Sequence, residues 1–121
     1  MNGDALSNAA NQFEEIGPEE AAQLIADGAY LLDVREDDEW AAGHAPDAVH
    51  IPVGALAQHT TEIPRDGEVY VICRSGARSA YAAQQLSGAG WKTINVADGM
   101  TGWAVAGRPM VSETGADPYV A

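Results

Sequence analysis

The sequence of 121 residues contains a single cysteine, Cys73, and only six lysines and arginines. One cysteine excludes a disulfide within the chain and a zinc site built from several cysteines of one chain. A lone thiol is typical of reducing compartments, so we expect a cytoplasmic location. No apolar run approaches the roughly 20 residues that a membrane span requires. The start of the chain lacks the basic and apolar regions of a secretory signal.

Positive charge is scarce, and its distribution is uneven. The chain has 18 acidic residues and a net charge of −12. Such a chain is repelled by nucleic acid and by anionic membranes, so we expect neither as a partner. We expect the excess acid to serve as a solubility coat. Two of the six cations, Arg74 and Arg78, lie in the short stretch 73–79, beside the only thiol.

Short apolar runs alternate with helical patterns along a chain long enough for one domain. We expect strands at residues 13–16, 29–34, 49–51, 69–73 and 93–96, and helices from residue 18, within 35–42, and over 77–87 and 99–106. Strands that alternate with helices predict a three-layer α/β domain with a mostly parallel sheet. We place this domain at residues 13–110, between a flexible N-terminal tail (1–12) and a loose C-terminal tail (111–121).

Cys73 lies where a predicted strand ends, which is where open parallel sheets bind their ligands. The loop that follows contains Ser75 and Gly76, which let the backbone curl before the next helix. A loop that enters a helix N-terminus directs several N–H groups at a common centre and forms an anion nest. We therefore predict a pKa of Cys73 below that of a free cysteine and a nucleophilic thiolate. The alternative is an inert cysteine at the end of a core strand.

Five motifs follow one another along the chain. They are Leu32-Asp33-Val34-Arg35, Glu39-Trp40-Ala41-Ala42-Gly43-His44, Ile51-Pro52, the loop 73–79 and Gly99-Met100-Thr101-Gly102-Trp103. With these motifs, residues 13–110 resemble the rhodanese-like sulfurtransferase domain family. The resemblance implies a single-domain, five-stranded α/β fold and a sulfurtransferase without a cofactor. It also implies that Cys73 takes a sulfane sulfur from a donor (thiosulfate or a persulfide), becomes a persulfide, and passes the sulfur to a thiophilic acceptor.

The length of the loop separates this activity from its alternatives. Cys73 to Arg78 is a span of six residues, whereas phosphatase and arsenate-processing relatives of the fold have a loop one residue longer. The larger ring fits a tetrahedral oxyanion, and the shorter one closes around a single sulfur. The family comparison thus favours sulfur transfer over a phosphatase or an arsenate reductase. A persulfide carrier or protein-interaction module with little independent turnover is the other alternative.

The resemblance also implies roles for the residues around the thiol. Cys73 is the expected catalytic residue, and the expected substrate-binding residues are Arg74, Ser75, Gly76, Ala77, Arg78 and Ser79. Arg78 either orients loop carbonyls and donor oxygens or forms a structural ion pair. Arg74 either steers anionic donors or contributes only to solubility.

Residues outside the loop are expected to support it. Asp33 and Arg35 brace the loop, whereas Glu39 and His44 satisfy local backbone groups and helix ends. The family has two glycines before the last helix, but here Asp98 takes the place of the first. Aspartate tolerates a left-handed backbone, yet its carboxylate near the site would disfavour thiosulfate. Because the chain has no second cysteine, the acceptor must be external: cyanide, a small thiol or a protein.

Overall fold

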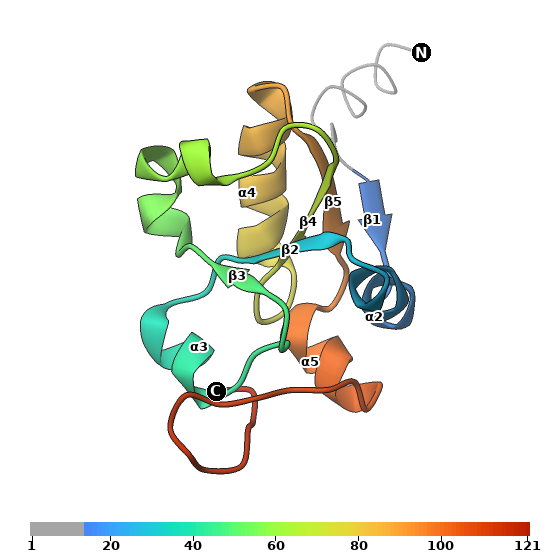
Figure 1. The fold of residues 1–121 in the computed structure, drawn as a ribbon, viewed down its shortest axis with the longest axis vertical. Coiled ribbons are helices and arrows are strands. Elements are labelled where there is room, and N and C mark those ends of the chain that lie inside the picture. Colours follow the sequence, from blue (N-terminus) through green and yellow to red (C-terminus); the bar gives the residue numbers. More distant parts are fainter. Residues whose placement is uncertain (1–13) are drawn as a thin grey trace.

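Five short strands form a parallel sheet in the computed structural model, which describes residues 14–121 (Figure 1). They are β1 (Glu14–Ile16), β2 (Tyr30–Asp33), β3 (Val49–His50), β4 (Glu68–Ile72) and β5 (Lys92–Val96). Their order across the sheet is β1-β5-β4-β2-β3, and every neighbouring pair is parallel. The predicted five-stranded parallel sheet is confirmed, and Cys73 follows its central strand. The predicted tail at residues 1–12 lies outside the described residues.

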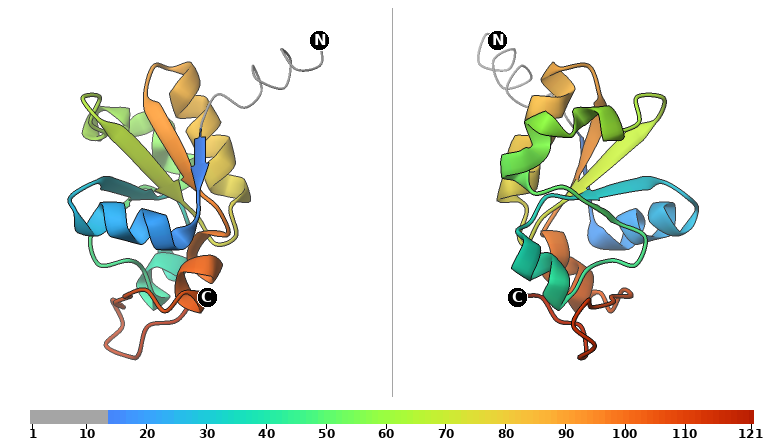
Figure 2. Two further views of the ribbon diagram at one scale, coloured as in Figure 1. Left: turned by 90° about the vertical axis from the view of Figure 1, so that its right-hand side faces the viewer. Right: turned by 60° about the vertical axis from the view of Figure 1, so that its left-hand side comes forward.

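Helices cover both faces of the sheet, as Figure 2 shows from two sides. They are α2 (Pro18–Ala26), α3 (Asp37–Ala42), α4 (Ala77–Gly88) and α5 (Gly99–Val105). Buried side chains of α4 share one hydrophobic cluster with the sheet, and those of α2 and α5 share the other. The arrangement is the predicted three-layer α/β fold.

The central strand β4 is buried on both faces, which explains its continuous apolar sequence. Val69 and Val71 pack into the cluster beneath α4, whereas Tyr70 and Ile72 pack into the cluster beneath α2 and α5. All four residues are at most 5% exposed. A strand of this kind in a parallel sheet has no polar face. The loop that follows β4 therefore starts from a rigid position.

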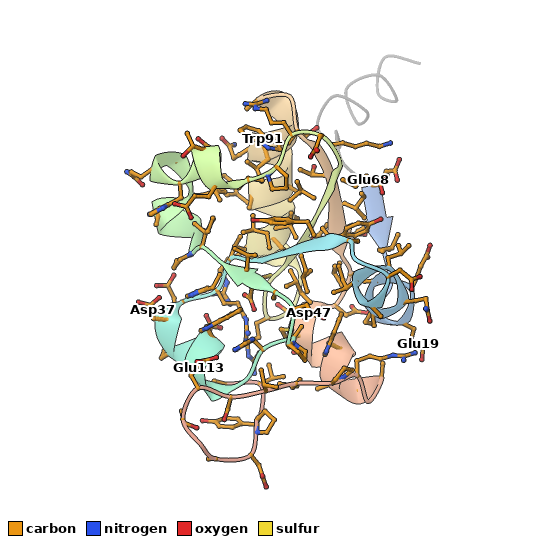
Figure 3. All side chains as sticks on the ribbon, in the orientation of Figure 1. Glu19, Asp37, Asp47, Glu68, Trp91 and Glu113 are labelled. Carbon is orange, nitrogen blue, oxygen red and sulfur yellow. The ribbon has the colours of Figure 1, made fainter. Side chains whose placement is uncertain are left out.

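Acidic side chains lie around the outside of the domain. Figure 3 shows Glu19, Asp37 and Glu68 toward the edges of the ribbon, and these three residues and Asp47 are all exposed. Their placement agrees with a solubility coat. Among residues 14–121, no helix has both the length and the apolar character needed to cross a bilayer.

Two segments differ from the sequence-based expectation. The connection from β3 to β4 contains two short 3₁₀ helices, η1 (Val53–Gln58) and η2 (Thr60–Glu62), that no helical periodicity had predicted. The segment 111–121, predicted as a loose tail, is instead hydrogen-bonded to the end of α3. The last carbonyls of a helix lack partners within the helix, and this segment supplies them. The expectation failed because these contacts join residues far apart in sequence.

Candidate active site

The sulfur of Cys73 lies inside the segment that joins β4 to α4 and includes the first turn of that helix, hereafter the cysteine loop (residues 73–79). Cys73 is 1% exposed. The backbone N–H of Gly76 donates to Sγ at 3.1 Å, and the hydroxyl of Ser79 lies 3.3 Å from Sγ. Gly76 has a φ of +116°, a left-handed conformation that glycine adopts without strain. The loop thus curls around the sulfur, as the sequence predicts.

Opposing effects act on the thiol. Burial raises the pKa of Cys73, but hydrogen bonds from the Ser79 hydroxyl and from the backbone N–H groups of Ser79, Gly76 and Ser75 lower it more. The net pKa lies below the ordinary value of a cysteine, because these donors stabilise the charged form. The direction agrees with the prediction and argues against the alternative of an inert core cysteine.

The start of α5 is hydrogen-bonded to the backbone of the cysteine loop. The N–H of Met100 donates to the carbonyl of Cys73 at 2.8 Å, and the N–H of Thr101 donates to the carbonyl of Arg74 at 2.9 Å. This approach is so close that a Cβ on Gly99 would meet the carbonyl oxygen of Arg74 at 2.7 Å. Asp98 has a φ of +63°, so aspartate does adopt the left-handed conformation expected here.

Arg78 forms an ion pair with Glu39 of α3, one of the two roles expected for it. Nη1 and Nη2 donate to the two carboxylate oxygens at 2.7 and 2.9 Å. Glu39 also accepts the N–H of Glu36 at 2.9 Å, which closes a capping box at the start of α3. Mainly through the hydrogen bond from Arg78, the pKa of Glu39 falls to about 2. Glu39 therefore also holds Arg78 of the cysteine loop, a role that the sequence does not predict.

The other arginine of the loop, Arg74, is exposed and contacts the far end of the chain. Its Nε donates to the carbonyl oxygen of Ala121 at 2.9 Å. The expected substrate-binding residues Ser75 and Ala77 are exposed on the same loop. Ser75 also lines a shallow cavity of about 290 Å³ together with Asp98. Asp98 is thus a neighbour of the cysteine loop.

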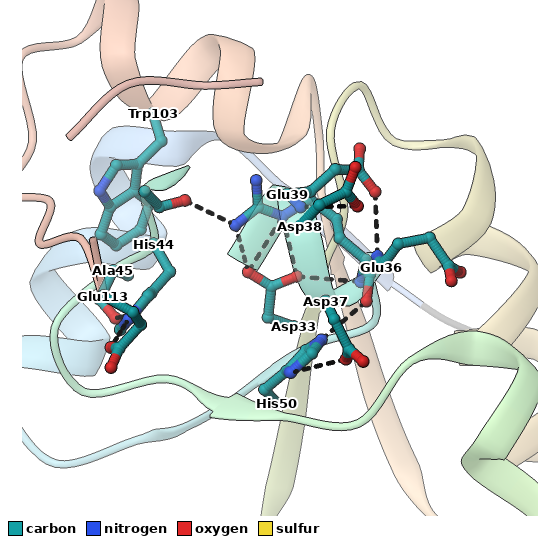
Figure 4. A network of polar contacts seen from close by, with 12 residues as sticks. Asp33, Glu36, Asp37, Asp38, Glu39, His44, Ala45, His50, Trp103 and Glu113 are labelled. Carbon is teal, nitrogen blue, oxygen red and sulfur yellow. Dashed lines mark hydrogen bonds and ion pairs between the residues drawn. The ribbon is translucent and has the colours of Figure 1, made fainter. Parts of the chain in front are cut away.

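Asp33, which Figure 4 labels, forms a buried ion pair with Arg35. Both side chains are fully buried, and Nη2 of Arg35 lies 2.8 Å from Asp33 Oδ2. The same Nη2 donates to the carbonyl of Gly43 at 2.8 Å. The pair therefore braces the end of α3, whereas the sequence predicts that it braces the cysteine loop.

His44 has a structural environment, as expected. It is 4% exposed, and its ring stacks on Trp40 with 3.4 Å between centroids. Its Nδ1 lies 2.9 Å from the carbonyl of Ala45, and its Nε2 lies 2.7 Å from the carboxylate of Glu113. Among residues 14–121, no three His, Cys, Asp or Glu side chains are grouped to hold a metal ion.

Comparisons with known proteins agree with this geometry. The model of the rhodanese-like domain matches residues 17–106. A putative sulfurtransferase of Bacillus subtilis, YtwF, is 44% identical over 80 residues, which cover 66% of this chain and 78% of YtwF. A sulfurtransferase of Allochromatium vinosum is 38% identical over 84% of this chain and 97% of its own length. A putative sulfur carrier protein of Bacillus subtilis, YrkF, is also 38% identical, over 84% of this chain and 56% of YrkF.

Solved structures of similar fold include rhodanese-related proteins and sulfurtransferases. A rhodanese-related protein from Thermoplasma volcanium has a TM-score of 0.77 and 31% identity, over 82% of this chain and 98% of that protein. A thiosulfate sulfurtransferase from Pseudomonas aeruginosa has a TM-score of 0.77 and 26% identity, over 90% of this chain and 22% of that protein. The chain therefore belongs to the rhodanese-like domain family.

Proposed function

We propose that this protein is a sulfurtransferase that carries a sulfane sulfur as a persulfide on Cys73. The observation that supports this most directly is the buried sulfur that faces the N–H of Gly76 and the hydroxyl of Ser79. A lowered thiol pKa increases the fraction of the nucleophilic thiolate. A persulfide places its negative charge on the outer sulfur, where convergent N–H groups stabilise it. The sulfurtransferases among its relatives support the same class of reaction.

The reaction has two half-steps. In the first, the thiolate of Cys73 attacks the sulfane sulfur of thiosulfate. A bond forms between Sγ and that sulfur, the sulfur–sulfur bond of thiosulfate breaks, and its electron pair leaves with sulfite. In the second, an external thiolate or cyanide attacks the outer sulfur, and the thiolate of Cys73 is released. A persulfide donor follows the same course, with a thiolate as the leaving group.

The cysteine loop supplies the binding groups for these steps. We assign the backbone N–H groups of Ser75, Gly76 and Ser79 to the transferred sulfur, with Ala77 starting the helix behind them. Arg74, which is exposed, binds the oxygens of an anionic donor. Arg78 fixes the start of α4 through Glu39. A lone thiol is typical of reducing compartments, which fits a cytoplasmic location.

Mass spectrometry of the intact protein tests the proposal. After treatment with thiosulfate, cysteine persulfide or 3-mercaptopyruvate, we expect an added mass of one sulfur atom that cyanide removes. The Cys73→Ala variant should show no adduct. The absence of an adduct with every donor would refute the assignment, and Cys73-dependent hydrolysis of a phosphate ester would favour a phosphatase instead.

A carrier role is the second candidate, because YrkF, which is 38% identical, is named a putative sulfur carrier protein. A carrier and an enzyme both load Cys73, but they differ in turnover. Steady-state formation of thiocyanate or of a small-thiol persulfide by the isolated protein indicates an enzyme. Stoichiometric loading with little turnover, increased strongly by a protein acceptor, indicates a carrier.

A further inference from the structure

The segment 111–121, which we call the C-terminal strap, is anchored on the end of α3. Val111 and His44 exchange two backbone hydrogen bonds of 2.9 Å, and the N–H of Tyr119 donates to the carbonyl of Ala42 at 3.1 Å. Gly43 lies so close that a Cβ there would meet the backbone nitrogen of Tyr119 at 2.8 Å. The strap is thus held at several points against the end of α3.

The strap ends at the cysteine loop. Val120 packs against the hydrophobic cluster beneath α2 and α5, and the next residue, Ala121, accepts a hydrogen bond of 2.9 Å from Nε of Arg74. The backbone of Arg74 is held as well, because its carbonyl accepts the N–H of Thr101 at 2.9 Å. Hydrogen bonds therefore hold both the backbone and the guanidinium of Arg74.

We propose that the C-terminal strap positions the Arg74 guanidinium to bind the oxyanion end of a sulfur donor. This inference rests on the proposed function. The bond from Nε orients the planar guanidinium and leaves both Nη groups for a bidentate contact with sulfonate oxygens. A guanidinium oriented in advance loses less side-chain entropy on binding. Because Arg78 is paired with Glu39, Arg74 is the arginine of the cysteine loop that a donor can engage.

The test loosens the end of the strap without changing its charge or length. In the variant Tyr119→Gly/Val120→Gly/Ala121→Gly, we expect the KM for thiosulfate to rise about three- to tenfold, the effect of one side chain that is no longer oriented, with kcat unchanged. Hydroxyethyl persulfide, which has no sulfonate oxygens, should keep its KM. The matched control Thr114→Gly/Ala116→Gly loosens the strap away from Arg74 and should leave both donors unaffected.

A double-variant cycle assigns the effect to Arg74. Arg74→Gln should raise the KM for thiosulfate, and adding the triple-glycine change should raise it no further. An unchanged or lower KM for thiosulfate in the triple-glycine variant would overturn the proposal. An equal rise for both donors would also overturn it, since that result indicates general loosening of the fold.

Sulfite binding separates this inference from the proposed function. Calorimetry on the Cys73→Ser variant measures the affinity for sulfite without any sulfur transfer. We expect the triple-glycine change to weaken this affinity about three- to tenfold, whether or not Cys73 forms a persulfide in the wild type. An unchanged affinity would refute the role of the strap, while persulfide formation on the wild type would still support the proposed function.

Discussion

The ion pair between Glu39 and Arg78 predicts how stability depends on pH. The pKa of Glu39 falls from an ordinary 4.5 to about 2, and each pKa unit corresponds to about 1.36 kcal/mol. The full lowering from 4.5 to about 2 would give about 3.4 kcal/mol. Arg78 is 35% exposed at its side chain, so solvent screens the pair and reduces this figure. We expect the Glu39→Gln variant to lose about 1–2 kcal/mol of unfolding free energy at neutral pH.

The sign of the pH dependence follows from the lowered pKa. The carboxylate of Glu39 stabilises the folded state fully above the pKa of the unfolded chain, and this contribution disappears as the pH falls from about 4.5 to about 2. The difference between the wild type and Glu39→Gln should therefore be constant near neutral pH and should shrink across this window.

Urea unfolding, followed by tryptophan fluorescence at a series of pH values, measures this difference. The control is Asp37→Asn, because Asp37 lies in the first turn of the same helix and its side chain is 92% exposed. We expect the control to change stability by less than about 0.5 kcal/mol. A difference between Glu39→Gln and wild type that does not vary with pH would refute the reasoning, as would equal stability at neutral pH.

Three further changes test the cysteine loop. Ser79→Ala removes a donor to Sγ and should raise the pKa of Cys73, which thiolate absorbance and slower alkylation at neutral pH would detect; an unchanged pKa would contradict the assigned cause. Gly99→Ala introduces a clash with the loop backbone and should lower stability by about 3 kcal/mol in thermal unfolding. Asp98→Gly should raise kcat/KM for thiosulfate about fivefold, or by about 1 kcal/mol, by removing one nearby charge; unchanged kinetics would show that the carboxylate does not face the donor.

The elements that the sequence predicts well are those whose signal is local. The apolar run of β4 and the helical spacing of Ala82, Ala83 and Leu86 in α4 each identify an element without knowledge of the fold. The 3₁₀ helices η1 and η2 have no such signal, because short turns of this type need little periodicity.

The candidate site also has a part with a local sequence signal and a part without one. The cysteine loop is contiguous, so the six-residue span from Cys73 to Arg78 and the position of the loop before a helix could be read directly from the chain. The supporting contacts are not local. Arg78 and Glu39 are 39 residues apart, and Arg74 and Ala121 are 47 residues apart. Opposite charges at 39 and 78 are compatible with a pair, but the acidic chain offers many other partners for each arginine. Only the packing of α3 beside the cysteine loop selects this one.

The N–H groups of the cysteine loop can face the sulfur only if the carbonyls of the loop have hydrogen-bond donors elsewhere. A peptide unit that turns its N–H toward the sulfur turns a carbonyl away, and a buried carbonyl needs a partner. The N–H groups at the start of α5 serve the carbonyls of Cys73 and Arg74. They reach these carbonyls because the chain enters α5 through two left-handed residues, Asp98 and Gly99, the second of which has no space for a side chain. The nest that stabilises the thiolate is thus built by two loops, and the glycine that permits it lies 26 residues beyond the cysteine.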